Sequence, residues 1–218
     1  MTDLLGRVRA ALGVTGDETD RRARVDRRLS SPPHPPMARA TEEADETERL
    51  DRLRQRLEGH HATTALLPAR GGIPAAVAAW LAAQALPKTA RIAPALSDLD
   101  WSPLGVETGA PRAEDRVGIS EAAVGIAETG SLVLHADADN PLTLAFTPEF
   151  HIVALAAEAI VGPIEAAWAW QRQAFPDRPP QSLTLVSGPS RTADIEQTMY
   201  LGAHGPRRLH VVIYGAES

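Results

Sequence analysis

The sequence predicts an α/β domain, in which a mixed β-sheet is flanked by helices, preceded by a helical N-terminal arm. Short apolar segments alternate with helical patterns between residues 62 and 96, which is typical of α/β sheets. A β-rich pair broken at Thr129-Gly130 adds antiparallel pairing. The 218 residues, 44% of them hydrophobic, suffice for one sizeable core. We therefore divide the chain into an arm, residues 1–40, and a domain, residues 41–218.

The arm begins with an amphipathic helix over residues 3–12. Gly13 can supply a left-handed C-cap, and the apolar residues share one face at helical spacing: Leu4, Leu5, Val8 and Leu12. So short a helix is unstable alone, and we expect it to dock on this domain, a second subunit or a partner. Residues 16–37 are polar and then proline-rich, which predicts an extended, mobile linker.

The first half of the domain alternates helices with strands. Acidic residues followed by an apolar leucine stripe predict a helix from Thr41 to Gly59. The segment "ATTALLPA" predicts a buried strand, a helix starts near Pro74, and "ARIAPAL" predicts a second strand. In sheets of this kind, ligands bind at the carboxyl ends of the strands.

The second half is richer in strands. "VGISEAAVGIAETGSLVLHA" predicts a strand pair, and two more short strands are expected around Pro148. A helix follows Pro163, with Trp168 and Trp170 on different faces. "QSLTLVSG" and "RRLHVVIYG" predict the last two strands.

Composition argues against several function classes. The net charge of −6, without a basic stripe, disfavours nucleic-acid binding. The sequence has no cysteine, so any redox role depends on a partner's cofactor. The histidine spacing matches no metal motif, which predicts that no metal is bound. Neither a signal peptide nor a span of ~20 apolar residues is present, and we expect a cytoplasmic protein without a membrane span.

The first candidate site is "SGPSRTADIE", which leaves a strand through Gly188. Backbone N–H groups at this turn, with Arg191 beside them, suit a phosphate or carboxylate. An alternative of equal weight is a structural turn in which Arg191 pairs with Asp194. A serine triad is disfavoured because the nucleophile-elbow pattern lacks its last glycine. The candidate binding residues are Gly188, Ser190, Arg191, Thr192, Asp194 and Glu196.

The second candidate site is "AETGSLVL". Glu128 ends a strand beside apolar residues and is a candidate base or nucleophile, unless it only begins the hairpin turn. The next three residues, Thr129, Gly130 and Ser131, can offer backbone N–H groups to an anion. His204 has glycines at 202 and 205, which makes it an accessible candidate for general base, or else a structural histidine.

Four segments, in this order, resemble the LUD-domain family, which includes lactate utilization protein C and YkgG: "ISEAAVGIAETGSLVL", "TPEFHIVAL", "GPSRTADIE" and "LGAHGPRRLHVVIYG". The opening "LLGRVRAALG" also resembles the family's first helix. The resemblance implies a fold of the NagB/RpiA/CoA-transferase type. It also implies a role in oxidising L-lactate to pyruvate with two partner proteins that carry iron–sulfur clusters, this chain itself binding no cofactor.

In that role, Glu128, Ser190, Arg191, Asp194 and His204 are expected to line one cleft, where Arg191 binds a carboxylate or phosphate. His204 or Glu128 would then move a proton. Two alternatives stay open. One is a stand-alone enzyme acting on a CoA thioester or sugar phosphate, with Glu128 as nucleophile or base. The other is a non-catalytic binding or regulatory module whose arm recruits partners.

Overall fold

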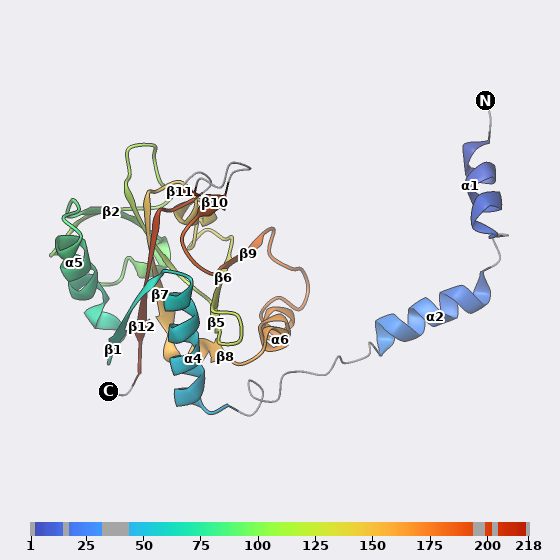
Figure 1. The fold of residues 1–218 in the computed structure, drawn as a ribbon, viewed down its shortest axis with the longest axis horizontal. Helices are drawn as coiled ribbons and strands as arrows, with labels where there is room; N and C mark the ends of the chain where they lie inside the picture. Colours follow the sequence, from blue (N-terminus) through green and yellow to red (C-terminus); the bar gives the residue numbers. More distant parts are fainter. Residues whose placement is uncertain (1–2, 15–17, 32–43, 194–198, 202–204, 217–218) are drawn as a thin grey trace. The chain divides into compact units, whose positions relative to one another are not determined.

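The computed structural model describes residues 3–14, 18–31, 44–193, 199–201 and 205–216. The chain divides into two units, Met1–Met37 and Ala38–Ser218 (Figure 1). This division falls three residues before the boundary that the sequence predicts.

The described residues of the N-terminal unit form two helices, α1 (Leu4–Leu12) and α2 (Thr19–Ser30). Asp3 caps α1 by accepting a hydrogen bond from Gly6 N at 2.8 Å, and Gly13 closes it with φ 61°. The prediction of an extended linker is wrong for the α2 segment. Arginine and alanine favour a helix there, and the first proline follows only at position 32.

The second unit is built on a six-stranded sheet in which every pair of neighbouring strands is parallel. Its strand order is β1-β12-β7-β4-β2-β3. The strands are β1 (Thr63–Leu67), β2 (Thr89–Ile92), β3 (Gly105–Thr108), β4 (Val117–Glu121), β7 (Phe150–Ala156) and β12 (Arg208–Tyr214). The α/β class is confirmed, but antiparallel pairs do not join this central sheet.

The antiparallel pairs lie in a second sheet of order β8-β5-β6-β9. It comprises β5 (Val124–Ile126), β6 (Ser131–His135), β8 (Ile160–Val161) and β9 (Leu183–Val186). The β5–β6 hairpin turns at Thr129-Gly130 as predicted. A separate hairpin joins β10 (Arg191–Ala193) to β11 (Met199–Leu201). The first of the two strands expected around Pro148 is instead a 3₁₀ helix, η3 (Leu142–Ala145).

The described residues of this unit form the helices α4 (Glu46–Gly59), α5 (Ile73–Ala83) and α6 (Ile164–Ala174). They also form short 3₁₀ turns, η1 (Arg70–Gly72), η2 (Pro94–Leu96) and η4 (Ala157–Ala159). A capping box of Asp45 and Glu48 starts α4, later than the Thr41 expected from sequence. Among the described residues, no helix has the length and apolar character needed to cross a membrane.

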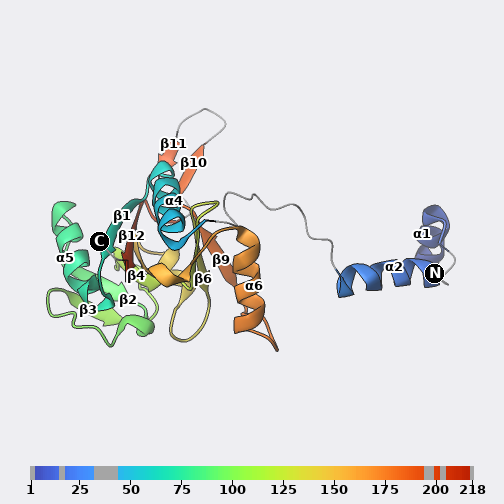
Figure 2. The ribbon, with the colours of Figure 1, turned by 90° about the horizontal axis from the view of Figure 1, so that it is seen from below.

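Side chains along a strand alternate between the two faces of the sheet, so their contacts show which helix covers which face. In β7, Val153 and Leu155 pack with α4 and the second sheet, whereas Ile152 and Ala154 pack with α5. The outer face of the second sheet is covered by α6 through Ala167. The layers therefore run α5, central sheet, α4 with the second sheet, and α6 (Figure 2).

Two histidines are buried in the central sheet. His151 is fully buried, with Nε2 2.7 Å from Ser120 Oγ, and burial lowers its pKa to about 3. His210 stacks on Trp80 with ring centroids 4.9 Å apart, and its Nδ1 lies 2.7 Å from Thr63 Oγ1. Burial lowers the pKa of His210 to about 4. Both imidazoles are therefore neutral at physiological pH.

Candidate functional site at the carboxyl ends of the parallel strands

A cavity of about 250 Å³ lies at the carboxyl ends of β4, β7 and β12. Alanines form its apolar part, and its polar lining consists of Glu121, His135, Asp137, Asp139, Asn140 and Tyr214. This is the edge of the sheet at which α/β proteins bind ligands.

Glu121, the last residue of β4, is held from three sides. Its Oε1 accepts hydrogen bonds from the Tyr214 hydroxyl at 2.9 Å and from Arg70 Nε at 3.5 Å. The side chain of Asn140 clamps its backbone: Nδ2 donates to Glu121 O at 2.8 Å, and Oδ1 accepts from Glu121 N at 3.4 Å. The position of this carboxylate is therefore fixed by groups from separate loops and strands.

Arg70 positions Glu121, and each of its three guanidinium nitrogens donates a hydrogen bond within the protein. Its Nη1 donates to Asp98 at 2.6 Å and its Nη2 donates to the carbonyl of Ala95 at 2.7 Å, in addition to the contact with Glu121. The hydrogen bond to Asp98 is the main cause that raises the pKa of Arg70. Arg70 thus acts as a brace between η1, η2 and β4.

Tyr214 ends β12 and donates to Glu121. Burial, followed by the hydrogen bond to Glu121, raises the pKa of Tyr214 to about 12. The phenol therefore keeps its proton at neutral pH, and its oxygen lone pairs are available to accept a hydrogen bond from a ligand.

His135 and Asp137 form a second polar pair. His135 Nε2 lies 2.7 Å from Asp137 Oδ2, and its ring packs edge-on against Phe175. Asp137 Oδ1 in turn accepts the backbone N–H groups of Asp139 and Asn140, at 2.9 and 2.6 Å. When Nε2 donates to the carboxylate, Nδ1 is the acceptor nitrogen, and this buried atom has no partner among the described residues. An imidazole oriented by a carboxylate is suited to accept a proton.

The cavity therefore presents mainly hydrogen-bond acceptors, namely carboxylate oxygens and a phenol oxygen. Such a lining suits a ligand that offers hydroxyl groups. Within the described ranges, no three histidine or acidic side chains gather in a way that could hold a metal ion.

The hydrogen bond between Glu121 and Tyr214 can be tested by titration. We expect Glu121→Gln to lower the pKa of Tyr214 by roughly one unit, because the acceptor loses its negative charge while burial persists. The second tyrosine, Tyr200, is replaced by phenylalanine in the background, so that phenolate absorbance reports Tyr214 alone. Circular dichroism recorded in parallel monitors alkaline unfolding. Glu158→Gln, an exposed carboxylate on η4, is the matched control. An unchanged pKa in Glu121→Gln would contradict the contact.

The two predicted turns do meet. Ser131 Oγ lies 2.7 Å from both Thr129 Oγ1 and Ser187 Oγ, which joins the "ETGS" turn to the strand end before Gly188. His60 Nδ1, at the end of α4, lies 2.8 Å from Ser187 O. A Cβ on Gly188 would come within 2.8 Å of His60 O. These contacts pack the turns against α4.

Glu128 has a structural contact. Its Oε2 accepts a hydrogen bond from Ile164 N at 3.1 Å, and its backbone N–H donates to Gly162 O at 3.0 Å. The carboxylate therefore caps the start of α6, where negative charge is stabilising. Its role as base or nucleophile stays a prediction.

Three more predicted site residues, Ser190, Arg191 and Thr192, lie at or next to β10. Ser190 N donates to Pro206 O at 2.8 Å, and Arg191 is exposed at the start of β10, followed by Thr192. Gly205 packs beside Ser190. Asp194, Glu196 and His204 lie outside the described residues, so the predicted convergence of these groups with Glu128 stays a prediction.

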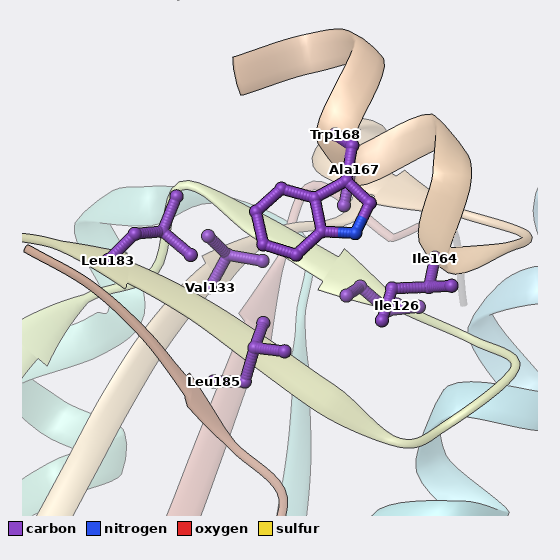
Figure 3. A pocket seen from close by; sticks show the side chains of 7 residues that line it. All are labelled: Ile126, Val133, Ile164, Ala167, Trp168, Leu183 and Leu185. Atoms are coloured by element: carbon purple, nitrogen blue, oxygen red, sulfur yellow. The ribbon is translucent and has the colours of Figure 1, made fainter. Parts of the chain in front are cut away.

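An apolar groove elsewhere has no room for a ligand. It lies between α6 and the second sheet, where Trp168 covers Val133 and approaches Leu183 and Leu185 (Figure 3). The side chains fill it, leaving a volume of about 0 Å³. This groove is a packing surface and not a second candidate site.

Sequence reasoning missed the cavity residues Glu121, His135, Asn140 and Tyr214, together with Arg70 beside Glu121, as functional candidates. A signal was present, because Glu121 and Tyr214 are the last residues of their strands and the carboxyl ends were expected to bind ligands. The missing information was the strand order, which alone brings these two ends together.

Comparisons with known proteins agree with the architecture. Residues 112–214 match the LUD domain. The chain is 40% identical over 98 residues to lactate utilization protein C of Deinococcus radiodurans, covering 43% of each protein. It is 32% identical over 109 residues to YkgG of Escherichia coli, covering 49% of this chain and 47% of YkgG.

Lactate utilization protein C of Oceanobacillus iheyensis is 31% identical over 102 residues, with 44% of this chain and 42% of the relative covered. The chain thus spans less than half the length of these relatives. The crystal structure of a DUF162 family protein from Deinococcus radiodurans shares the fold, with a TM-score of 0.63 and 23% identity over 79% of this chain and 99% of that one.

Proposed function

Because residues 112–214 match the LUD domain, we propose that this chain is a component of an L-lactate utilization system. In this proposal it takes part in oxidising lactate to pyruvate together with iron–sulfur partner proteins. The observation that carries the proposal is the similarity, at 31 to 40% identity, to two relatives named lactate utilization protein C.

We assign electron transfer to the partner proteins because of the amino-acid composition of this chain. A sequence without cysteine supplies no thiolate ligands for an iron–sulfur cluster. The two electrons released when a 2-hydroxy acid becomes a 2-oxo acid would then pass to clusters on the partners. The contribution of this chain would be to bind, orient and exchange protons.

The cavity at the carboxyl ends of the strands is the proposed place for that contribution. Its acceptors suit the hydroxyl group of a small ligand, and the hydrogen-bonded pair of His135 and Asp137 is the proposed acceptor of the hydroxyl proton. Arg70 is engaged with Asp98, Ala95 and Glu121 and does not line the cavity, so we propose that a cation from elsewhere binds the ligand carboxylate. Arg191 is the predicted candidate for that cation.

Growth tests this proposal. In the organism that encodes the chain, deleting its gene is expected to abolish growth on L-lactate and to leave growth on pyruvate unchanged. A plasmid copy restores growth, whereas His135→Gln lowers lactate consumption at least tenfold, since removing a general base typically costs more than that.

The matched control is Arg178→Gln, an exposed residue before β9, which should restore growth fully. The melting temperature of each purified variant separates loss of function from loss of fold. Unimpaired growth of the deletion strain on lactate would contradict the role in lactate utilization. Full activity of His135→Gln would contradict only the assignment of the base.

A further inference from the structure

Helices α1 and α2 of the N-terminal unit each expose an aliphatic stripe. Neither α1 nor α2 has a buried residue. The exposed aliphatic side chains of α1 are Leu4, Leu5, Val8 and Leu12, and those of α2 are Val25 and Leu29. At 100° per residue, each set lies within an arc of about 100° or less. Isolated helices of 9 and 12 residues are marginal in water. These stripes therefore need a surface to cover them.

Arginines border both stripes. On the helical wheel of α1, Arg7 lies on one side of the stripe and Arg9 on the other. On α2, Arg21, Arg24 and Arg28 surround a hollow beside Val25. Arg22 lies on the other side, next to Leu29, and the ion pair of Arg21 with Glu18 is long, at 4.0 Å. Neither aspartate of α2 lies within the stripe. The exposed surface is therefore aliphatic in the middle and cationic at its edges.

We propose that α1 and α2 bind the surface of anionic phospholipid bilayers. Aliphatic side chains would enter the boundary of the acyl chains, while the flanking arginines reach the lipid phosphates, which a guanidinium binds in a bidentate manner. Residues 1–37 contain seven arginines and five acidic residues, although the whole chain carries −6. The attraction to an anionic surface is thus confined to this unit. A planar membrane can cover both stripes, whereas a partner protein would need grooves whose spacing matches that of the two helices. This binding is independent of lactate utilization.

Cosedimentation of the full chain with vesicles tests the proposal. We expect binding to phosphatidylcholine vesicles that contain one quarter phosphatidylglycerol, little binding to pure phosphatidylcholine, and release at high salt. The triple variant Arg21→Gln, Arg24→Gln, Arg28→Gln should bind about 100-fold more weakly, at roughly fivefold per arginine. The double variant Leu5→Ser, Leu12→Ser should abolish binding to the vesicles.

The matched control removes three arginines from the second unit, Arg112→Gln, Arg172→Gln and Arg178→Gln, and should bind as the parent does. Helical circular dichroism should rise when vesicles are added to the parent and the control, and stay constant for the leucine variant. Equal binding to both vesicle types, undiminished binding of the arginine triple variant, or no binding to either vesicle would overturn the proposal. In the last case an acidic protein groove becomes the occupant to seek.

Discussion

Lowering the pH from 7.5 to 4.5 is expected to remove about 5 kcal/mol from the free energy of unfolding through two histidines alone. The pKa values of His151 and His210 are lowered by burial to about 3 and about 4. In the unfolded chain both take up a proton near pH 6.5, so the unfolded state binds more protons below that pH. Their stabilising effect is therefore complete above pH 6.5 and is lost as the pH falls, at roughly 2 to 3 kcal/mol for each histidine by pH 4.5.

Urea unfolding at a series of pH values measures this loss. The double variant His151→Leu, Ser120→Ala removes both members of one buried hydrogen bond. We expect it to halve the slope of the free energy of unfolding against pH between pH 6.5 and 4.5. The control His61→Asn replaces an exposed histidine whose φ of 68° asparagine tolerates. It should leave the slope unchanged. Identical slopes in the parent and the double variant would show that His151 is not the group that titrates.

Replacing Gly130 with alanine is expected to cost about 4 kcal/mol of stability. The residue has φ 67°, and a Cβ there would lie 2.4 Å from Arg56 Cβ and 3.0 Å from Arg56 C. The left-handed conformation costs ~1 kcal/mol for alanine, and relieving an overlap with the backbone of α4 adds ~3 kcal/mol. The turn between β5 and β6 therefore requires glycine for two separate reasons.

Gly215→Ala distinguishes these two reasons. Gly215 has φ 78°, but nothing lies within 4 Å of the position that a Cβ would take there. This variant should lose only ~1 kcal/mol, the conformational part. Chemical denaturation of both variants gives the difference directly. Equal losses in the two variants would mean that the "ETGS" turn does not pack against α4.

The secondary structure of the second unit was largely predictable because most of its elements carry local signals. Pro74 and Pro163 mark helix starts, and Thr129-Gly130 marks a hairpin. The arm was harder, since the arginines of α2 suggest a solvated linker as readily as a helix. Strand β3 could not be recognised because Gly105–Thr108 has no buried residue and no apolar alternation.

The candidate site was less predictable than the fold. The sequence motifs identified the turns at Thr129 and Gly188, which do lie together but are packed against α4. The cavity depends on residues distant in sequence, such as Arg70, Glu121 and Tyr214. No local pattern reveals such a set, because pairing between distant strands places them at one edge. Glu128 was identified from its motif, but the structure also gives it a role that the motif did not indicate, since its carboxylate caps a helix.

The position of β12 has a consequence for biosynthesis. This strand lies between β1 and β7, so that Thr63 pairs with His210 and Val153 with Val211. Until the ribosome has released the segment through Tyr214, β1 and β7 lack the strand that joins them, and the central sheet stays open between them. Non-local pairing of this kind folds slowly and leaves apolar strand edges unprotected. The central sheet can therefore close only once β12 has emerged from the ribosome, and until then the edges of β1 and β7 are open to aggregation.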